Sequence, residues 1–191
     1  MGLKNNSLYC YMNACLQCFL TITELRDYYL NNEFKRFHNT TTLSNSNEYS
    51  RKMGEFLVDV FGSSSKNEEI LNPTGLKNLI RKKFYPTMQH DSHEFFMHII
   101  SSLQDEETPI EIKKFDGNVS KENSNRSLKQ ICQEYFEANP GLIDSIFTGI
   151  NRSVVECNSC NYESVTYKPF SAMSLGFETT LEKSLKRHFE T

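Results

Sequence analysis

A cysteine follows a polar turn close to the start of the chain. Lys4, Asn5, Asn6 and Ser7 form the polar run, and a mostly apolar run begins at Cys10. Ser7 has the side chain of a helix cap, so we predict a helix with Cys10 in its first turn. Unpaired backbone N–H groups and the positive end of the helix dipole favour a thiolate there. Cys10 is therefore a candidate nucleophile; the alternative is a small buried apolar side chain.

A cysteine nucleophile needs a base within hydrogen-bond reach, normally a histidine. The chain has five histidines, His38, His90, His93, His98 and His188. His93 and His98 lie off the apolar stripe of their predicted helix, so we expect them to be solvated. His90 is placed to line a cleft. None has the Gly-rich, aromatic strand context of a positioned base, so spacing alone identifies no base.

Two further cysteines have the spacing of a structural metal site. Cys157 and Cys160 form a Cys-x-x-Cys pair between two stretches rich in Val, Thr, Tyr and Phe. This pattern favours a zinc knuckle at the tip of a β-hairpin, and the alternative is a reduced turn with two free thiols. Tetrahedral zinc needs four ligands, and Cys132 and His188 are weak candidates for a third. We predict half of a zinc site, with the other half beyond Thr191.

The elements that must position these residues are mostly helical. Apolar side chains at helical spacing predict six helices. They cover residues 10–29, 51–61, a segment from Asn72-Pro73 to Phe84, 92–104, 127–138 and a final stretch from about residue 181. Asp91 and Glu94 have the spacing of a capping box at the start of the 92–104 helix.

Strands are expected late in the chain. The predicted hairpin pairs residues 147–156 with 162–170, and a short strand follows at 173–177. The polar runs 31–50 and 105–126 are predicted to be loops. Helices that precede strands favour an α+β arrangement over alternating βαβ units.

Composition excludes several classes of partner. The net charge is −3 over 191 residues, which is unlike a nucleic-acid or membrane-surface binder. No apolar run approaches the roughly 20 residues that span a bilayer. The polar residues 4–7 lie where a secretory signal would be apolar. Six cysteines, three of them between residues 10 and 18, do not resemble a disulfide framework. We expect a cytoplasmic or nuclear protein without nucleic-acid or membrane partners.

Three segments, in order, resemble motifs of the ubiquitin-specific proteases, papain-like thiol hydrolases that remove ubiquitin from proteins. GLKNNSLYCYMNACLQ at 2–17 is similar to the cysteine box, and QHDSHEF at 89–95 to the second signature. FTG at 147–149, the Cys-x-x-Cys at 157–160 and FSAMSL at 170–175 resemble the start of the zinc-bearing fingers. One departure is Ser-Leu-Tyr directly before the cysteine, where the family usually has Gly-Asn-Thr or Gly-Ala-Thr.

The resemblance implies a papain-like α+β fold. Residues 1–145 would form the helical thumb that carries the cysteine box. Residues 146–191 would begin the fingers, with the first β-hairpin and its Cys-x-x-Cys. The palm would be incomplete, because the family's histidine box and its Asp or Asn partner follow the fingers, beyond Thr191.

The resemblance also assigns roles to four residues. Cys10 would attack the carbonyl that follows ubiquitin's C-terminal glycine, and Asn5 would contribute to the oxyanion hole. Gln89 and Asp91 would line the channel for ubiquitin's basic C-terminal tail. A capping box explains Asp91 and Glu94 without any substrate, and that alternative stays open.

The implied activity is thiol-dependent hydrolysis of isopeptide and peptide bonds at the C-terminus of ubiquitin. Ubiquitin and ubiquitinated proteins would be the partners, and catalysis needs no cofactor. We expect little turnover from residues 1–191 alone, because the base is not among them. One alternative is a non-catalytic ubiquitin-binding protein of the same fold. Another is a zinc-knuckle interaction domain in which Cys10 is only a core residue.

Overall fold

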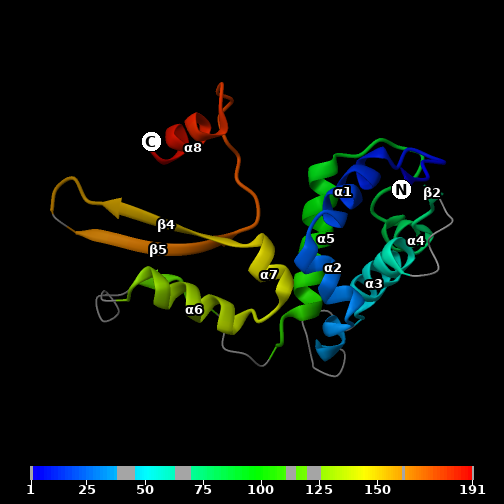
Figure 1. Ribbon diagram of the computed structural model, residues 1–191. Coiled ribbons are helices and arrows are strands. Elements are labelled where there is room, and N and C mark those ends of the chain that lie inside the picture. Colours follow the sequence, from blue (N-terminus) through cyan, green and yellow to red (C-terminus); the bar gives the residue numbers. More distant parts are fainter. Residues whose placement is uncertain are drawn as a thin grey trace. The chain divides into compact units, whose positions relative to one another are not determined.

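The computed structural model describes residues 2–37, 46–62, 70–110, 115–119, 126–160 and 162–190 (Figure 1). His38 lies outside these residues. The chain folds as two compact units. The helical unit comprises Met1–Asp116 and Asn125–Phe147, and the hairpin unit comprises Gly117–Ser124 and Thr148–Thr191. Helices and small sheets are both present, as the sequence predicted.

The helical unit combines helices with a short two-stranded sheet. Its elements are β1 (Gly2–Leu3), α1 (Cys10–Leu20), α2 (Thr23–Leu30), the 3₁₀ helix η1 (Glu33–Phe37), α3 (Glu48–Phe61), β2 (Ile70–Leu71), α4 (Thr74–Ile80), α5 (Ser92–Glu107), α6 (Leu128–Ala138) and α7 (Leu142–Phe147). β1 and β2 pair in parallel, with Leu3 opposite Leu71. The sequence did not predict this pairing, which ties the N-terminal strand to the segment that leads into α4.

The core of the helical unit is centred on the packing of α1 against α5, the blue and green helices of Figure 1. Met12 and Leu16 of α1, and Phe95 and Ile99 of α5, are each at most 1% exposed. Burying such side chains contributes roughly 1.5–3 kcal/mol apiece. This packing positions the first residues of the two helices, Cys10 and Ser92, relative to each other.

The single helix predicted over residues 10–29 is wrong, because the chain breaks between α1 and α2. Ile22 has extended backbone angles (φ −87°, ψ 105°). The Thr21 hydroxyl donates to the Cys18 carbonyl at 2.7 Å. Three consecutive β-branched residues at 21–23 weaken the helix, and a hydroxyl that bonds the preceding turn helps to end it.

The predicted start of α4 is displaced by one residue. Pro73 is the N-cap residue rather than the first helical residue, and α4 ends at Ile80, so Phe84 lies beyond it. The residue before a proline is disfavoured in helical geometry, which is consistent with a start after Asn72-Pro73.

The predicted Asp91–Glu94 capping box is only half formed. Asp91 accepts from the backbone N–H of His93 at 2.6 Å, and no return bond from Glu94 is present among the described residues.

The charged run after residue 104 is not all loop, because α5 continues to Glu107. Glu106 and Glu107 are each only 1% exposed. Glu106 accepts two backbone N–H groups from the first turn of α3, at 2.9 and 2.7 Å. Glu107 accepts one from the first turn of α7, at 2.9 Å. The first N–H groups of a helix have no partner within it. These two carboxylates therefore accept hydrogen bonds from the otherwise unpaired N–H groups at the starts of two helices. The other predicted loop, 31–50, contains η1 and the start of α3.

The hairpin unit contains the strand pair that the sequence predicted. β4 (Gly149–Glu156) and β5 (Glu163–Phe170) are antiparallel, in register from Gly149–Phe170 to Glu156–Glu163. β3 (Asn118–Val119), which the sequence did not predict, adds to the other edge of β5. The helix α8 (Leu181–Phe189) is confirmed and is capped by the Thr180 side chain.

Two strand predictions near this hairpin are wrong. The strand expected from residue 147 begins at Gly149, because the preceding residues form α7. The stretch 173–177 is not a strand. Across the described ranges, no helix is both long and apolar enough to span a membrane.

Candidate active site

Cys10 is the first residue of α1, and its side chain is exposed. Its neighbours Tyr9 and Tyr11 are buried, at 7% and 5% exposure. Two buried tyrosines therefore anchor the backbone on either side of a thiol that faces outward. This position is not that of a core side chain, and it leaves the sulfur open to a substrate.

Asn5 contacts the residue directly before the thiol. Its Oδ1 accepts a hydrogen bond from the Tyr9 backbone N–H at 3.0 Å. The predicted cap, Ser7, is wrong: Tyr9 is the N-cap residue and makes no side-chain capping bond. Because Oδ1 faces an N–H group, the two donors on Nδ2 are on the other side of the Asn5 amide. Within the described part of the chain, Nδ2 has no hydrogen-bond partner.

The departure from the family before Cys10 causes no backbone strain. In the described ranges, the non-glycine residues with positive φ are Asn32 and Asn47. Ser7 therefore has an ordinary negative φ, and the turn does not need a glycine there. The Tyr9 ring is buried, with the Lys77 ammonium 4.8 Å from its centre.

The segment that carries Gln89 and Asp91 lies against the start of α1. The Tyr11 ring is in edge contact with the His90 ring, with centroids 5.3 Å apart. It also stacks on Phe84, at 5.7 Å. Since His90 lies between Gln89 and Asp91, and Tyr11 follows Cys10, the two motifs meet here. The Gln89 and Asp91 side chains are exposed, and the Asp91 carboxylate caps α5.

A second tie joins the two motifs through another cysteine. The Cys15 thiol donates to the Ser92 carbonyl at 3.1 Å. Burial raises the pKa of the Cys15 thiol, which suits a hydrogen-bond donor better than a nucleophile. Cys15 thus helps to hold α1 against the start of α5.

The described histidines do not supply an evident base. His90 shares a hydrogen bond of 3.1 Å between its Nε2 and the Tyr85 carbonyl. The prediction that His98 is solvated is wrong. Its Nε2 lies 2.8 Å from the Tyr49 hydroxyl, and burial lowers its pKa. His93 and His188 are exposed. No hydrogen bond joins any described histidine to Cys10.

Sequence reasoning missed a buried lysine beside the polar turn. Lys77 of α4 is 6% exposed, and its Nζ reaches the carbonyl of Lys4 at 2.8 Å. The one signal in the sequence is its position on α4, next to Leu76 and one turn before Ile80, both buried. A lysine among core positions must find acceptors for its ammonium group.

Cys157 and Cys160 lie exposed at the turn of the hairpin. The Cys157 backbone N–H donates to the Tyr162 carbonyl at 3.0 Å, which closes the turn. Hydrogen bonds from Ser159 and Cys160 lower the pKa of the Cys157 thiol. Two thiols at such a turn fit two ligands of a tetrahedral zinc. In the part of the chain that the structure describes, no group of three or more His, Cys, Asp or Glu side chains is arranged to hold a metal.

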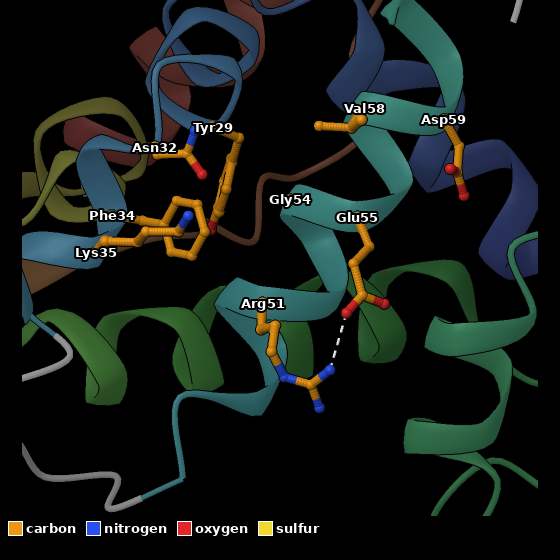
Figure 2. A pocket seen from close by; sticks show the side chains of 9 residues that line it. All are labelled: Tyr29, Asn32, Phe34, Lys35, Arg51, Gly54, Glu55, Val58 and Asp59. Atoms are coloured by element: carbon orange, nitrogen blue, oxygen red, sulfur yellow. Dashed lines mark hydrogen bonds and ion pairs between the residues drawn. The ribbon is translucent and has the colours of Figure 1, made fainter. Parts of the chain in front are cut away.

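A cavity of about 400 Å³ lies elsewhere in the helical unit, between α3 and the α2–η1 segment (Figure 2). The rings of Tyr29 and Phe34 line it together with charged side chains that include the Arg51–Glu55 pair. Gly54 leaves room for Phe34, whose ring would lie 3.2 Å from an added Cβ. None of the predicted site residues lines this cavity.

Comparison with known proteins identifies sequence relatives of this chain. A family model described as ubiquitin carboxyl-terminal hydrolase matches residues 1–187. Human ubiquitin carboxyl-terminal hydrolase 2 is 29% identical over 181 residues, which cover 91% of this chain and 29% of that protein. Ubiquitin carboxyl-terminal hydrolase 12 of Saccharomyces cerevisiae is 26% identical over 203 residues, covering 97% of this chain and 16% of the relative.

A further relative is ubiquitin carboxyl-terminal hydrolase 32 of Drosophila melanogaster, 27% identical over 180 residues, which cover 91% of this chain and 10% of the relative. The chain thus spans less than a third of the length of these curated relatives. The family model nevertheless covers nearly all of the chain, and it includes both motifs that meet at Cys10. The chain belongs to the ubiquitin carboxyl-terminal hydrolase family, as a ubiquitin-specific protease catalytic domain.

Proposed function

We propose that this protein is a thiol-dependent deubiquitinase that hydrolyses isopeptide and peptide bonds at the C-terminus of ubiquitin. The names of the relatives support the reaction class. The observation that carries the proposal is the hydrogen bond from the Tyr9 N–H to Asn5 Oδ1. It ties an amide with two available donors to the residue that precedes an exposed thiol at a helix start.

In the proposed mechanism, the Cys10 thiolate attacks the carbonyl carbon after ubiquitin's last glycine. The carbonyl oxygen becomes an oxyanion, which accepts hydrogen bonds from Asn5 Nδ2 and the Cys10 backbone N–H. When the tetrahedral intermediate collapses, the amine leaves with the proton that the Cys10 thiol lost on becoming a thiolate, and ubiquitin remains as a thioester on Cys10. Water then hydrolyses the thioester and restores the thiol. Residues 1–191 offer no assigned base, so we propose that they turn over slowly by themselves.

The subdomain roles follow the same proposal. Residues 1–145 act as the thumb of a papain-like fold, and residues 146–191 begin the fingers. Gln89 and Asp91 line the path of ubiquitin's basic tail, for which an exposed carboxylate is a suitable partner. Capping of α5 does not prevent this role, because a carboxylate accepts several hydrogen bonds at once.

We propose that Cys157 and Cys160 supply two of the four ligands of a structural zinc. In the full-length protein, the Cys157→Ser/Cys160→Ser variant is expected to lose about one bound zinc per molecule, measured by elemental analysis after dialysis. The Cys18→Ser variant, which replaces an exposed thiol outside the hairpin, should keep its zinc. An unchanged zinc content in the double variant would exclude the pair as ligands.

Labelling of the thiol tests the proposed function directly. Ubiquitin with an electrophile at its C-terminus should form a covalent adduct with the purified chain at Cys10, detected by intact mass and peptide mapping.

Matched controls separate the outcomes of this labelling. Cys10→Ala should abolish the adduct, and Cys18→Ala should not, although Cys18 is also an exposed cysteine of α1. Binding of unmodified ubiquitin without any Cys10 adduct would contradict the enzymatic proposal and support a non-catalytic ubiquitin-binding protein.

A further inference from the structure

The Lys77 ammonium is buried, and each of its three N–H donors has an acceptor. Nζ lies 2.8 Å from the Lys4 carbonyl, 2.8 Å from Asn72 Oδ1 and 3.3 Å from Asn6 Oδ1. All three acceptors are uncharged, so in the described part of the chain no ion pair compensates for burial. Burial lowers the pKa of Lys77. Burying an ammonium group without an ion pair costs free energy, so we expect Lys77 to have a role other than ion pairing.

The contacts of Lys77 surround one residue, Asn5. Lys4 and Asn6 are the residues on either side of Asn5, and both accept from Nζ. Nζ also lies 4.8 Å from the centre of the Tyr9 ring, a cation–π contact. Tyr9 is the residue whose N–H the Asn5 side chain accepts. Lys77 thus touches the residues before and after Asn5 and the residue that Asn5 itself binds.

Among the described residues, few hydrogen bonds other than those of Lys77 join this turn to the rest of the protein. The Lys4 N–H donates to the Leu71 carbonyl at 2.8 Å, which extends the β1–β2 pairing as far as residue 4. Beyond that point, the Leu8 N–H reaches the Pro86 carbonyl only at 3.4 Å, which is long for an N–H···O bond. Lys77 therefore supplies a short contact to the Lys4 carbonyl, at 2.8 Å, and a longer one to Asn6 Oδ1, at 3.3 Å, on either side of Asn5.

We propose that Lys77 is a positioning residue for oxyanion stabilisation. By holding Lys4, Asn6 and Tyr9, its ammonium group fixes the turn so that the Asn5 amide presents its donors beside the Cys10 thiol. Preorganised donors stabilise a transition state because they need no rearrangement as charge develops. This inference rests on the proposed function for its catalytic meaning, while the fixing of the turn can be measured without any substrate.

Amide hydrogen exchange tests the fixing of the turn. In Lys77→Met, the Tyr9 amide should exchange about tenfold faster, as expected when a hydrogen bond of roughly 1.4 kcal/mol is loosened. Amides in the middle of α5 should keep their protection. Lys82→Met removes an exposed lysine near the end of α4 and should leave Tyr9 unchanged. Unchanged Tyr9 exchange in a folded Lys77→Met protein would overturn the inference, whether or not the protein is an enzyme.

Affinity for a transition-state mimic tests the catalytic half in the full-length protein. Ubiquitin with a C-terminal aldehyde adds the Cys10 thiol across its carbonyl, and the carbonyl oxygen becomes a tetrahedral oxyanion or hydroxyl. Lys77→Met should weaken binding of this aldehyde about tenfold or more while affinity for unmodified ubiquitin stays unchanged. Lys77→Arg, which keeps charge and donors, should recover part of the loss. A purely structural role would weaken both ligands alike.

A double variant separates failure of this inference from failure of the proposed function. Asn5→Ala/Lys77→Met should bind the aldehyde no worse than Asn5→Ala, within about twofold, because Lys77 acts through Asn5. If the wild-type protein prefers the aldehyde and Lys77→Met retains that preference, the inference is wrong and the function stands. If the wild-type protein shows no preference for the aldehyde, the function fails, and the exchange of the Tyr9 amide still decides whether Lys77 fixes the turn.

Discussion

Replacing Asn5 by alanine should lower kcat for cleavage of ubiquitin conjugates by about 10²–10³-fold, the effect of removing one oxyanion donor. KM should change little, because the interaction with the oxyanion is made only in the transition state. The measurement is steady-state kinetics on the full-length protein with a ubiquitin C-terminal fluorogenic substrate. We expect a loss of kcat of this size because, in the described part of the chain, no other side-chain amide is hydrogen-bonded to the residue before Cys10.

Asn5→Asp separates the donor role of Asn5 from its structural role. Aspartate keeps an oxygen that accepts the Tyr9 N–H, so the turn should stay folded. It lacks the two amide donors, however, and brings a negative charge toward the developing oxyanion. Asn5→Asp should therefore lose at least as much kcat as Asn5→Ala while keeping more stability. Normal turnover by Asn5→Asp would show that Asn5 only supports the turn.

Asn78→Ala is the matched control for this loss. Asn78 is an exposed asparagine of α4, so the kinetics of Asn78→Ala should equal those of the wild-type protein. A similar loss in Asn78→Ala would mean that the assay reports general damage rather than a lost donor.

The candidate site was predictable from the sequence where its chemistry is local. Cys10 and Asn5 lie five residues apart, and Gln89 and Asp91 share one short motif, so residue types and spacing are enough to identify them. Lys77 could not be found in this way. Its acceptor on Lys4 lies 73 residues away in the chain, and only the folded packing of α4 against the polar turn brings the two together.

The errors in the predicted fold have the same physical origin. Glu106 and Glu107 look solvated in a run of charges, but the N–H groups that pair with Glu106 are 56 and 57 residues away. The β1–β2 pairing joins segments that are each only two residues long, too short for a periodic pattern. The β4–β5 hairpin was predictable because its partners are neighbours in the chain and carry strongly β-forming residues.

Adding a methyl group at position 141 should lower the free energy of unfolding by about 3–4 kcal/mol, through overpacking and lost hydrogen bonds. A Cβ on Gly141 would lie 2.7 Å from Glu107 Cβ and 3.1 Å from its Cδ. Glu107 is held in place, because its carboxylate accepts the Tyr28 hydroxyl at 2.5 Å and the Ile143 N–H at 2.9 Å. Moving it away leaves both buried donors unpaired.

Urea denaturation of Gly141→Ala measures this loss. Gly176→Ala is the control, since an added Cβ there meets nothing closer than 3.9 Å. It should change stability by at most about 1 kcal/mol, in the stabilising direction. Equal stability of Gly141→Ala and the wild-type protein would show that the backbone at residue 141 can move aside without disturbing Glu107.

Substitutions at residue 107 test whether the loss at position 141 acts through the carboxylate. Glu107→Gln keeps the shape and can still bond both Tyr28 and Ile143, so it should lower the free energy of unfolding less than Glu107→Ala does. Burial raises the pKa of Glu107, so the folded state holds this proton more tightly than the unfolded state. Its contribution to stability falls as the pH rises through the folded pKa, and the cost of Glu107→Gln should therefore be larger at low pH than at pH 7.

Combining the two sites gives the sharpest test. Glu107→Gly removes every side-chain atom that an added methyl group at 141 would strike, Cβ included, together with the acceptor that Gly141→Ala displaces. Gly141→Ala should consequently cost less than about 1 kcal/mol in the Glu107→Gly background, a coupling of at least about 2 kcal/mol between the two positions. Fully additive losses would place the damage in the backbone at residue 141. Strong coupling would establish that the end of α5 and the start of α7 are held together by one buried carboxylate.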